Sequence, residues 1–312
     1  MTRARSVVTM DNRAEVREFL ISRRAKITPA RAGLPDVGAR RVPGLRRGEV
    51  AVLAGVSIEY YSKLERGALG GVSASVLDAI ARALQLDDAE RSYLFDLARA
   101  ADGTSALVRP TRRTTKRWTP RPSLQWVLDS VTAGPAIVRN GRMDLLATNL
   151  LGRAMHASLY AREGHPNFAR FTFLDDESCS SYPDWSGAAD ICVSILRTEA
   201  GRDPHDKALH DLVGELSTRS PEFRRRWGAH DVRLHGAGVK HFRHAAVGEL
   251  ALSYESVELV SEPGLTLTFY AAEPASPTAE ALALLSTWAA TELSQTTMSA
   301  AGTPAPNRNI QG

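Results

Sequence analysis

Residues 45–67, LRRGEVAVLAGVSIEYYSKLERG, constrain the fold of this 312-residue chain more than any other segment. The first half repeats apolar residues at helical spacing, at Leu45, Val50, Leu53 and Ala54. Gly55 follows where a left-handed backbone would reverse the chain, a conformation that glycine adopts without steric cost. Ser57 is a good N-cap for a second helix, in which Tyr60 or Tyr61 and Leu64 face inward. The segment therefore predicts a helix-turn-helix, with the small Ala51 allowing its two helices to cross closely.

The part EVAVLAGVSIEYYSKLERG resembles the lambda-repressor-like, or XRE-type, helix-turn-helix, in the form common in actinobacterial regulators. The resemblance implies an all-α domain of five helices that binds a double-stranded DNA operator. It places the exposed side of the second helix in the major groove and the arginines before the first helix at phosphates. The residues assigned to DNA binding in this way are Arg46, Arg47, Ser57, Ile58, Glu59, Tyr60, Ser62, Lys63 and Arg66.

Two other interpretations of these residues stay open. They could form an ordinary solvated helix surface, or a helix-turn-helix used only for protein contacts. Gly48 also departs from the family pattern, because a helix-forming residue is expected there and an interior glycine costs about 1 kcal/mol relative to alanine.

The charge of the chain is divided unevenly. Residues 1–122 carry 23 Lys and Arg against 13 Asp and Glu, whereas residues 123–312 carry 16 against 22. A basic half suits a polyanionic partner, because Lys and Arg that neutralise phosphates release counterions. We therefore expect the first part to bind DNA and the second part to have another role.

The sequence predicts four segments. Residues 1–101 form the helix-turn-helix domain, and residues 102–122 form a basic linker that is either a hinge or an arm on DNA. Residues 123–292 form an α+β domain: a short helix, a two-residue hairpin at Asn140-Gly141, several helices, three strands and a last helix. We expect an antiparallel sheet with helices over one face, and a disordered tail over 293–312.

Two stretches of the second domain carry a further resemblance. DWSGAADICVSILRTEAGRDPHDKALHDLVGELSTRSPEFRRRWGAHDVR and KHFRHAAVGELALSYESVELVSEPGLTLTFYAAEP are similar to the MmyB-like ligand-binding domain, a PAS-like fold. The resemblance implies a cavity for a small, largely apolar ligand, with fatty-acyl compounds the leading class. The candidate ligand-binding residues are Trp185, Ile195, Arg197, Phe223, Trp227, His230, His241, Phe242 and Tyr254.

An enzyme is a weaker interpretation of the second domain. The pairs His210-Asp211 and His230-Asp231 suggest a metal-dependent phosphohydrolase, but the further histidine that such a site needs is missing upstream. A third interpretation is a protein-interaction or dimerisation module without a ligand.

Other features exclude several classes of protein. The two cysteines, Cys179 and Cys192, are too few for a disulfide framework and are not spaced as a zinc site. We found no secretory signal and no apolar run near the roughly 20 residues of a membrane span. We therefore expect a cytoplasmic transcription regulator, not an enzyme, without a cofactor, metal or membrane partner, and a homodimer on adjacent DNA half-sites.

Overall fold

The computed structural model describes residues 12–35, 42, 44–102, 118–231 and 236–301. Five helices make up the N-terminal domain: α1 (Asn12–Lys26), α2 (Arg47–Ala54), α3 (Ile58–Glu65), α4 (Ala74–Ala83) and α5 (Asp88–Ala101). Their buried apolar side chains form one core, which includes Phe19, Tyr61 and Leu94. Ser73 and Asp87 cap α4 and α5, as their polar side chains predict.

The C-terminal part begins with a helix and a strand pair and continues with seven helices. These elements are α7 (Pro122–Ser130), β1 (Ala136–Asn140), β2 (Leu145–Thr148), α8 (Leu150–Met155), α9 (Ala157–Tyr160), α10 (Phe168–Leu174), α11 (Glu177–Ser181), α12 (Trp185–Arg202), α13 (Lys207–Arg219) and α14 (Pro221–Gly228). Three strands and a long helix follow: β3 (Ala237–His244), β4 (Gly248–Glu258), β5 (Leu265–Ala271) and α15 (Pro277–Ala301).

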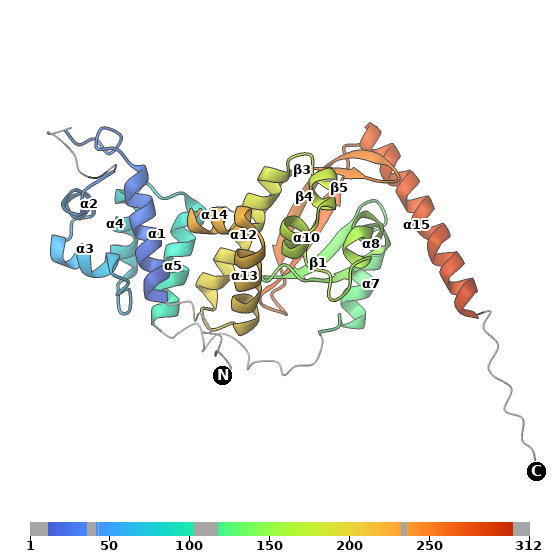
Figure 1. Ribbon diagram of the computed structural model, residues 1–312, viewed down its shortest axis with the longest axis horizontal. Helices are drawn as coiled ribbons and strands as arrows, with labels where there is room; N and C mark the ends of the chain where they lie inside the picture. Colours follow the sequence, from blue (N-terminus) through green and yellow to red (C-terminus); the bar gives the residue numbers. More distant parts are fainter. Residues whose placement is uncertain (1–11, 36–41, 43, 103–117, 232–235, 302–312) are drawn as a thin grey trace, which may run out of the picture.

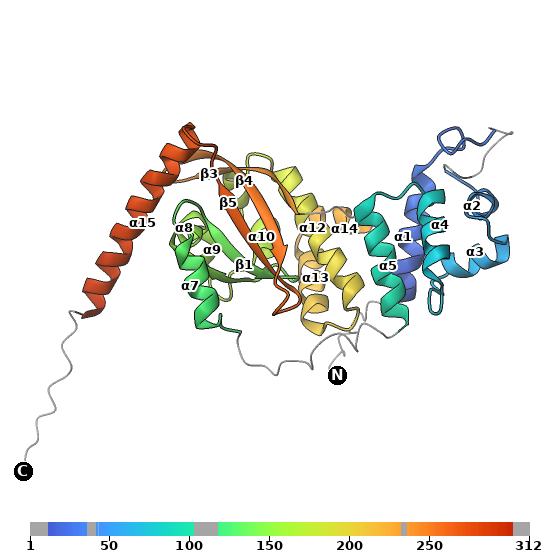
Figure 2. The same ribbon diagram turned by 180° about the vertical axis from the view of Figure 1, so that it is seen from behind.

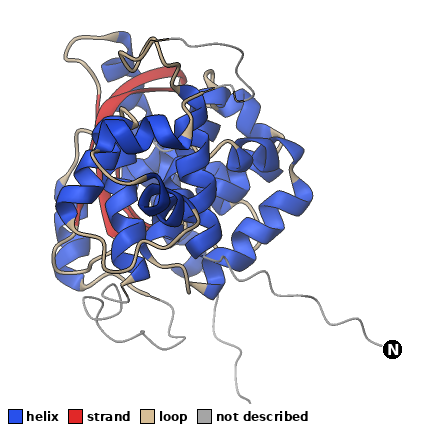
Figure 3. Cartoon of the chain, turned by 90° about the vertical axis from the view of Figure 1, so that its left-hand side faces the viewer, coloured by secondary structure: helices blue, strands red, loops and turns tan. Residues whose placement is uncertain are grey.

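The strands form one antiparallel sheet in the order β2-β1-β5-β4-β3, which confirms the α+β prediction. Ile137 pairs with Thr268, so the early hairpin joins the late strands at the centre of the sheet. Figure 1 shows the N-terminal helices at one end of the molecule and α15 at the other, and Figure 2 shows the same order from behind. In the end-on view of Figure 3, the strands lie along one side, with helices filling the rest.

Helices cover both faces of this sheet, which differs from the predicted single face. Ile137 and Tyr270 face the large core that α8, α10, α12, α13 and α14 share. Val138 and Leu267 alternate to the other face, where they pack against Leu128 of α7. Helix α7 therefore closes the second face at the β1–β5 end.

The predicted two-residue hairpin is wrong. Strand β1 ends at Asn140 and β2 begins at Leu145, so four residues connect them. The Asn140 side chain accepts a hydrogen bond from the Asp144 amide at 3.0 Å and donates one to Asp144 Oδ2 at 2.8 Å. Met143, and not Gly141, adopts the positive φ of 67°. The asparagine thus closes a longer loop through its side chain.

The boundaries at the linker and tail also differ in detail. Most of the predicted linker, residues 103–117, lies outside the described residues, but Trp118 and Arg121 donate hydrogen bonds to Glu262 at 2.6 and 3.0 Å. Helix α15 runs to Ala301 through residues that the sequence assigned to a disordered tail, since no glycine or proline interrupts it before Gly302. Residues 302–312 lie outside the description. No described helix is long and apolar enough to cross a membrane.

Candidate functional site

The turn between α2 and α3 has the geometry that its sequence predicts. Gly55 is left-handed, with φ of 65°, and the Val56 amide donates to the Ala51 carbonyl at 3.0 Å. Ser57 then caps α3, because its hydroxyl accepts a hydrogen bond from the Tyr60 amide at 3.0 Å. Local hydrogen bonds therefore stabilise the reversal of the chain between the two helices.

Helix α3 presents a polar face to solvent. Tyr61 and Leu64 are fully buried beneath it, which decides the choice between the two tyrosines, since Tyr60 is only half-buried. The exposed members of the predicted DNA-binding set are Arg46, Arg47, Ser57, Ile58, Glu59, Lys63 and Arg66, while Tyr60 and Ser62 are half-buried.

A buried carboxylate fixes this helix to its neighbours. Glu65 is 1% exposed at the end of α3 and accepts from Arg24 Nε at 2.8 Å and from Arg47 Nε at 2.7 Å. Burial acts to raise the pKa of Glu65, but its hydrogen bonds with the two guanidinium groups outweigh burial and lower it. Arg24 also donates to the Leu45 carbonyl at 2.7 Å. Arg47 is therefore held in an ion pair as well as being half exposed.

The C-terminal domain contains a cavity between the sheet and α12. Its volume is about 130 Å³, room for about four water molecules at roughly 30 Å³ each. The walls come from β1, β3, β5, α10 and α12 and are largely apolar, with Ile137, Phe168 and Ile191 among them. Asp184, Val239 and His241 are the exposed lining residues, so they mark the mouth.

Two basic side chains line this apolar cavity. Arg139 of β1 is 7% exposed, and burial lowers the pKa of its guanidinium. The Lys240 ammonium lies 4.5 Å from the ring centroid of Tyr254 and 5.7 Å from that of Tyr270. Burial and the charge of Arg139 lower the pKa of Lys240 to about 7. A carboxylate that contacts either group would gain a charge-assisted hydrogen bond inside this apolar cavity.

His156 adds a polar atom without a partner. It lines the same cavity, is 4% exposed, and its Nε2 has no hydrogen-bond partner among the described residues. Burial, with the charges of Lys240 and His244, lowers the pKa of His156 to about 3, so the ring is neutral. The imidazole is therefore available to bond a polar group of a ligand.

Sequence reasoning missed Arg139, Lys240 and His156. The signal for Lys240 was present, because it alternates with Phe242 on β3 and so shares the inward face of that strand. The other two depend on which segments meet in space.

Three of the nine predicted ligand-binding residues line the cavity, and the other six lie elsewhere. Ile195, His241 and Phe242 line the cavity. Phe223 and Trp227 stack on one another, at 5.6 Å between ring centroids, and Trp185 packs against Phe173 beside them. Tyr254 lies behind Lys240 on the sheet. The remaining two, Arg197 and His230, lie at the contact between the two domains.

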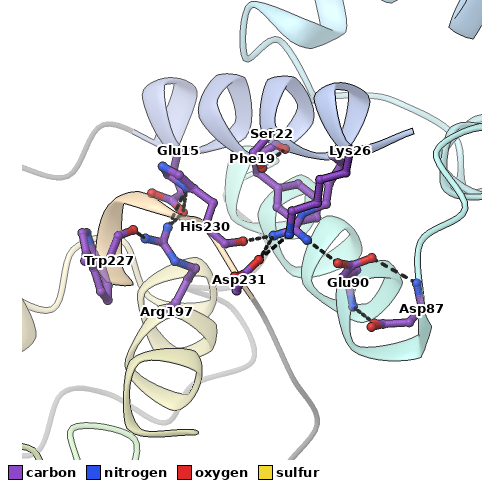
Figure 4. Close-up of polar contacts among 11 residues, drawn as sticks. Glu15, Phe19, Ser22, Lys26, Asp87, Glu90, Arg197, Trp227, His230 and Asp231 are labelled. Atoms are coloured by element: carbon purple, nitrogen blue, oxygen red, sulfur yellow. Dashed lines mark hydrogen bonds and ion pairs between the residues drawn. The ribbon is translucent and has the colours of Figure 1, made fainter. Parts of the chain in front are cut away.

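Arg197 is fully buried and forms an ion pair with Glu15 of α1 (Figure 4). Burial acts to raise the pKa of Glu15, but His230 and Arg197 outweigh it and lower the pKa to about 2. Glu15, Glu18 and His230 are a group of possible metal ligands among the described residues. The guanidinium of Arg197 occupies this group, since its Nη1 lies 2.8 Å from His230 Nδ1 and also contacts Glu15. A divalent cation would meet a fixed positive charge there.

Comparisons with known families identify both domains. The family described as "MmyB-like transcription regulator ligand binding domain" matches residues 120–285, just over half of the chain. The chain belongs to this MmyB-like family. A helix-turn-helix domain family matches residues 16–94. None of the curated proteins matched the chain.

The two matches confirm the helix-turn-helix and MmyB-like resemblances and the transcription-regulator prediction, while the actinobacterial form stays a prediction. The MmyB-like chain is a ligand-responsive transcription regulator with a DNA-binding helix-turn-helix domain and a C-terminal ligand-binding domain. Both families are those of transcription regulators.

Proposed function

We propose that this MmyB-like regulator binds a specific DNA operator through α3 and senses a small apolar molecule that carries an acidic head group, as a fatty acid does. The ligand class rests on one observation, two basic side chains, the buried Arg139 and the half-buried Lys240, that line a cavity whose other walls are mainly apolar. A carboxylate would gain charge-assisted hydrogen bonds from both groups, and an alkyl chain would bury apolar surface along α12.

The DNA contacts assigned from the sequence stay a prediction and form part of this proposal. Lys63 and Arg66 support it, because Lys63 is exposed on α3, Arg66 is exposed at the C-cap of that helix, and neither has an ion-pair partner among the described residues. Ile58, 52% exposed, is suited to a thymine methyl group. We also propose a homodimer, since one five-helix module offers a small contact area and two half-sites add affinity.

The ligand class can be tested by calorimetric titration of the purified chain with decanoate and with decanol, which share an alkyl chain. We expect decanoate to bind at least about tenfold more tightly than decanol, which corresponds to about 1.4 kcal/mol. Lys240→Met should remove most of that preference while leaving decanol binding intact. Equal affinity for the two compounds, or an unchanged preference in Lys240→Met, would contradict the acidic-ligand assignment.

A protein-interaction module without a ligand is the second candidate. The cavity of about 130 Å³ favours the ligand-binding alternative, since a domain used only for protein contacts needs no such space. We propose that the chain is a regulator without enzymatic activity, because both matched families are those of transcription regulators.

A further inference from the structure

Helix α12 belongs both to the ligand cavity and to the contact between the domains. Its cavity-lining residues are Gly187, Ala188, Ile191, Cys192 and Ile195. Its last two turns pack against α5 of the N-terminal domain. A single helix of 18 residues therefore extends from the cavity to the N-terminal domain, and Figures 1 and 2 show it between the sheet and α5.

Arg197 begins the contact with the N-terminal domain. It lies two residues after Ile195, and its guanidinium bonds to Glu15 of α1, to His230 Nδ1 and to the Trp227 carbonyl (Figure 4). A second set of bonds lies beside it, where Arg23 of α1 contacts the His230 carbonyl and Asp231. The contact is thus made mainly of charged and polar groups.

One glycine sets how closely the two domains approach. A Cβ added at Gly201 of α12 would lie 2.5 Å from Cε2 of Tyr93 on α5, which is too close for two carbon atoms. The Tyr93 hydroxyl donates to Glu15 Oε1 at 2.6 Å, so the same ring belongs to the Arg197 cluster. Any larger residue at this position must displace either the Tyr93 ring or α12 itself.

A second set of contacts connects the cavity with this end of α12. Gly141 follows β1, the strand of Arg139, and a Cβ added there would lie 2.3 Å from Cδ of Glu199. Glu199 is buried on α12 between Arg197 and Gly201, and its charge acts on the Arg139 guanidinium. An anion that binds the Arg139 guanidinium would weaken the electrostatic attraction between this guanidinium and the Glu199 carboxylate.

Some hydrogen-bonding groups at the contact between the domains lack partners among the described residues. Arg23 Nε and Arg197 Nε are buried without hydrogen-bond partners among the described residues. His230 adopts a positive φ of 53°, which is strained for a residue with a side chain. Both features lower the cost of moving the domains apart or sliding them.

This contact leaves the DNA-reading face free. Helix α3 lies on the far side of the N-terminal domain from α12 in both views, with α1 and α5 between them (Figures 1 and 2). The contact therefore governs where α3 is placed and does not mask it.

We propose that α12 couples the two domains: filling the cavity shifts its last turns against α1 and α5 through Arg197 and Gly201, and so changes the placement of α3. The inference rests on the proposed function, because it describes how that cavity regulates DNA binding. A ligand acts in this way only if it binds the two arrangements unequally.

Gly201→Ala tests the proposal without touching the cavity or α3. The matched control is Gly214→Ala on α13, where an added Cβ meets no atom within 4 Å. Alanine favours the helix at both positions, and circular dichroism checks that each variant is folded before DNA is added. Operator affinity is measured with and without decanoate, on a duplex that the wild-type chain selects from genomic fragments, and decanoate binding is measured separately.

We expect decanoate to change operator affinity at least about fivefold in the wild-type chain and in Gly214→Ala, within the range of known couplings. Gly201→Ala should bind decanoate normally but show less than a twofold change on DNA, a limit set within the experimental scatter of such titrations. A full response in Gly201→Ala, or decanoate binding without any response in the wild-type chain, would overturn the coupling role of α12.

A second measurement separates this inference from the ligand class. If decanoate does not bind at all, the proposed ligand is wrong, and coupling is judged from Lys240→Met, which perturbs the cavity directly. Hydrogen exchange of α1 and α5 amides should then differ between Lys240→Met and the wild-type chain, and the difference should vanish in the Gly201→Ala background. Identical exchange in all these proteins would refute the coupling.

Discussion

The free energy of unfolding of the wild-type chain should depend on pH through the side-chain amine of Lys240. Replacing Lys240 by methionine should remove that dependence. The ammonium group lies against two tyrosine rings near Arg139, and its pKa is lowered from 10.5 to about 7. In the unfolded chain the lysine regains its ordinary pKa, because both burial and the neighbouring charge are lost.

The direction and size of the effect follow from proton binding. Below about pH 7 both states hold the proton, so the penalty of the buried charge is constant. Between about pH 7 and about pH 10 the unfolded state binds more protons, so stability rises with pH. Each pKa unit is worth about 1.4 kcal/mol, and the free energy of unfolding should gain about 2 kcal/mol from this group between about pH 7 and about pH 9.

Urea unfolding followed by circular dichroism at both pH values measures this gain. The control is Lys207→Met, since Lys207 is exposed on α13 and pairs with Asp211 at 2.7 Å. Other titrating groups contribute equally to all three proteins. The wild-type chain and Lys207→Met should therefore gain about 2 kcal/mol more than Lys240→Met over this interval. The same gain in Lys240→Met as in the wild-type chain would refute the reasoning.

Three further predictions concern other parts of the molecule. Lys63→Ala and Arg66→Ala should each weaken operator binding, as measured by filter binding at several salt concentrations. If the replaced side chain contacts a phosphate, the slope of log affinity against log salt concentration should fall by about 1. Unchanged affinities and slopes would contradict DNA contact. Gly48→Ala should raise the free energy of unfolding by up to about 1 kcal/mol, because an added Cβ would meet Ile58 at an ordinary 3.5 Å; a loss of stability in thermal unfolding would show a hidden clash. Asn149→Ala should cost about 2–4 kcal/mol in chemical denaturation, since this buried side chain bonds four backbone groups, Ala136 N, Gly152 N, Val131 O and Gly134 O; a cost below about 1 kcal/mol would contradict that role.

Features that depend on neighbouring residues could be predicted from the sequence. The turn at Gly55, the cap at Ser57 and the exposed face of α3 all follow from residues within a few positions of each other. The α+β class followed from the order of helical and alternating segments, which the sheet confirms. The family resemblances depended on runs of this kind, and both are confirmed.

Some short patterns did not predict which side-chain contacts form in the fold. Asn140-Gly141 is a strong signal for a two-residue turn, yet the Asn140 side chain closes a longer loop onto Asp144. The MmyB-like resemblance made Phe223 and Trp227 candidates for the cavity wall, but these rings stack on each other within the core.

The sequence by itself determined a basic, helix-turn-helix half and an acidic α+β half, because charge balance, caps and periodicity are properties of short segments. Only the tertiary structure decided that Arg139, His156 and Lys240 face one cavity, since β1, the residue that ends α8, and the much later strand β3 meet there. It also decided that Arg197 joins the domains instead of lining that cavity. A side chain two positions along from a cavity-lining residue points to another side of a helix, and only packing determines what lies there.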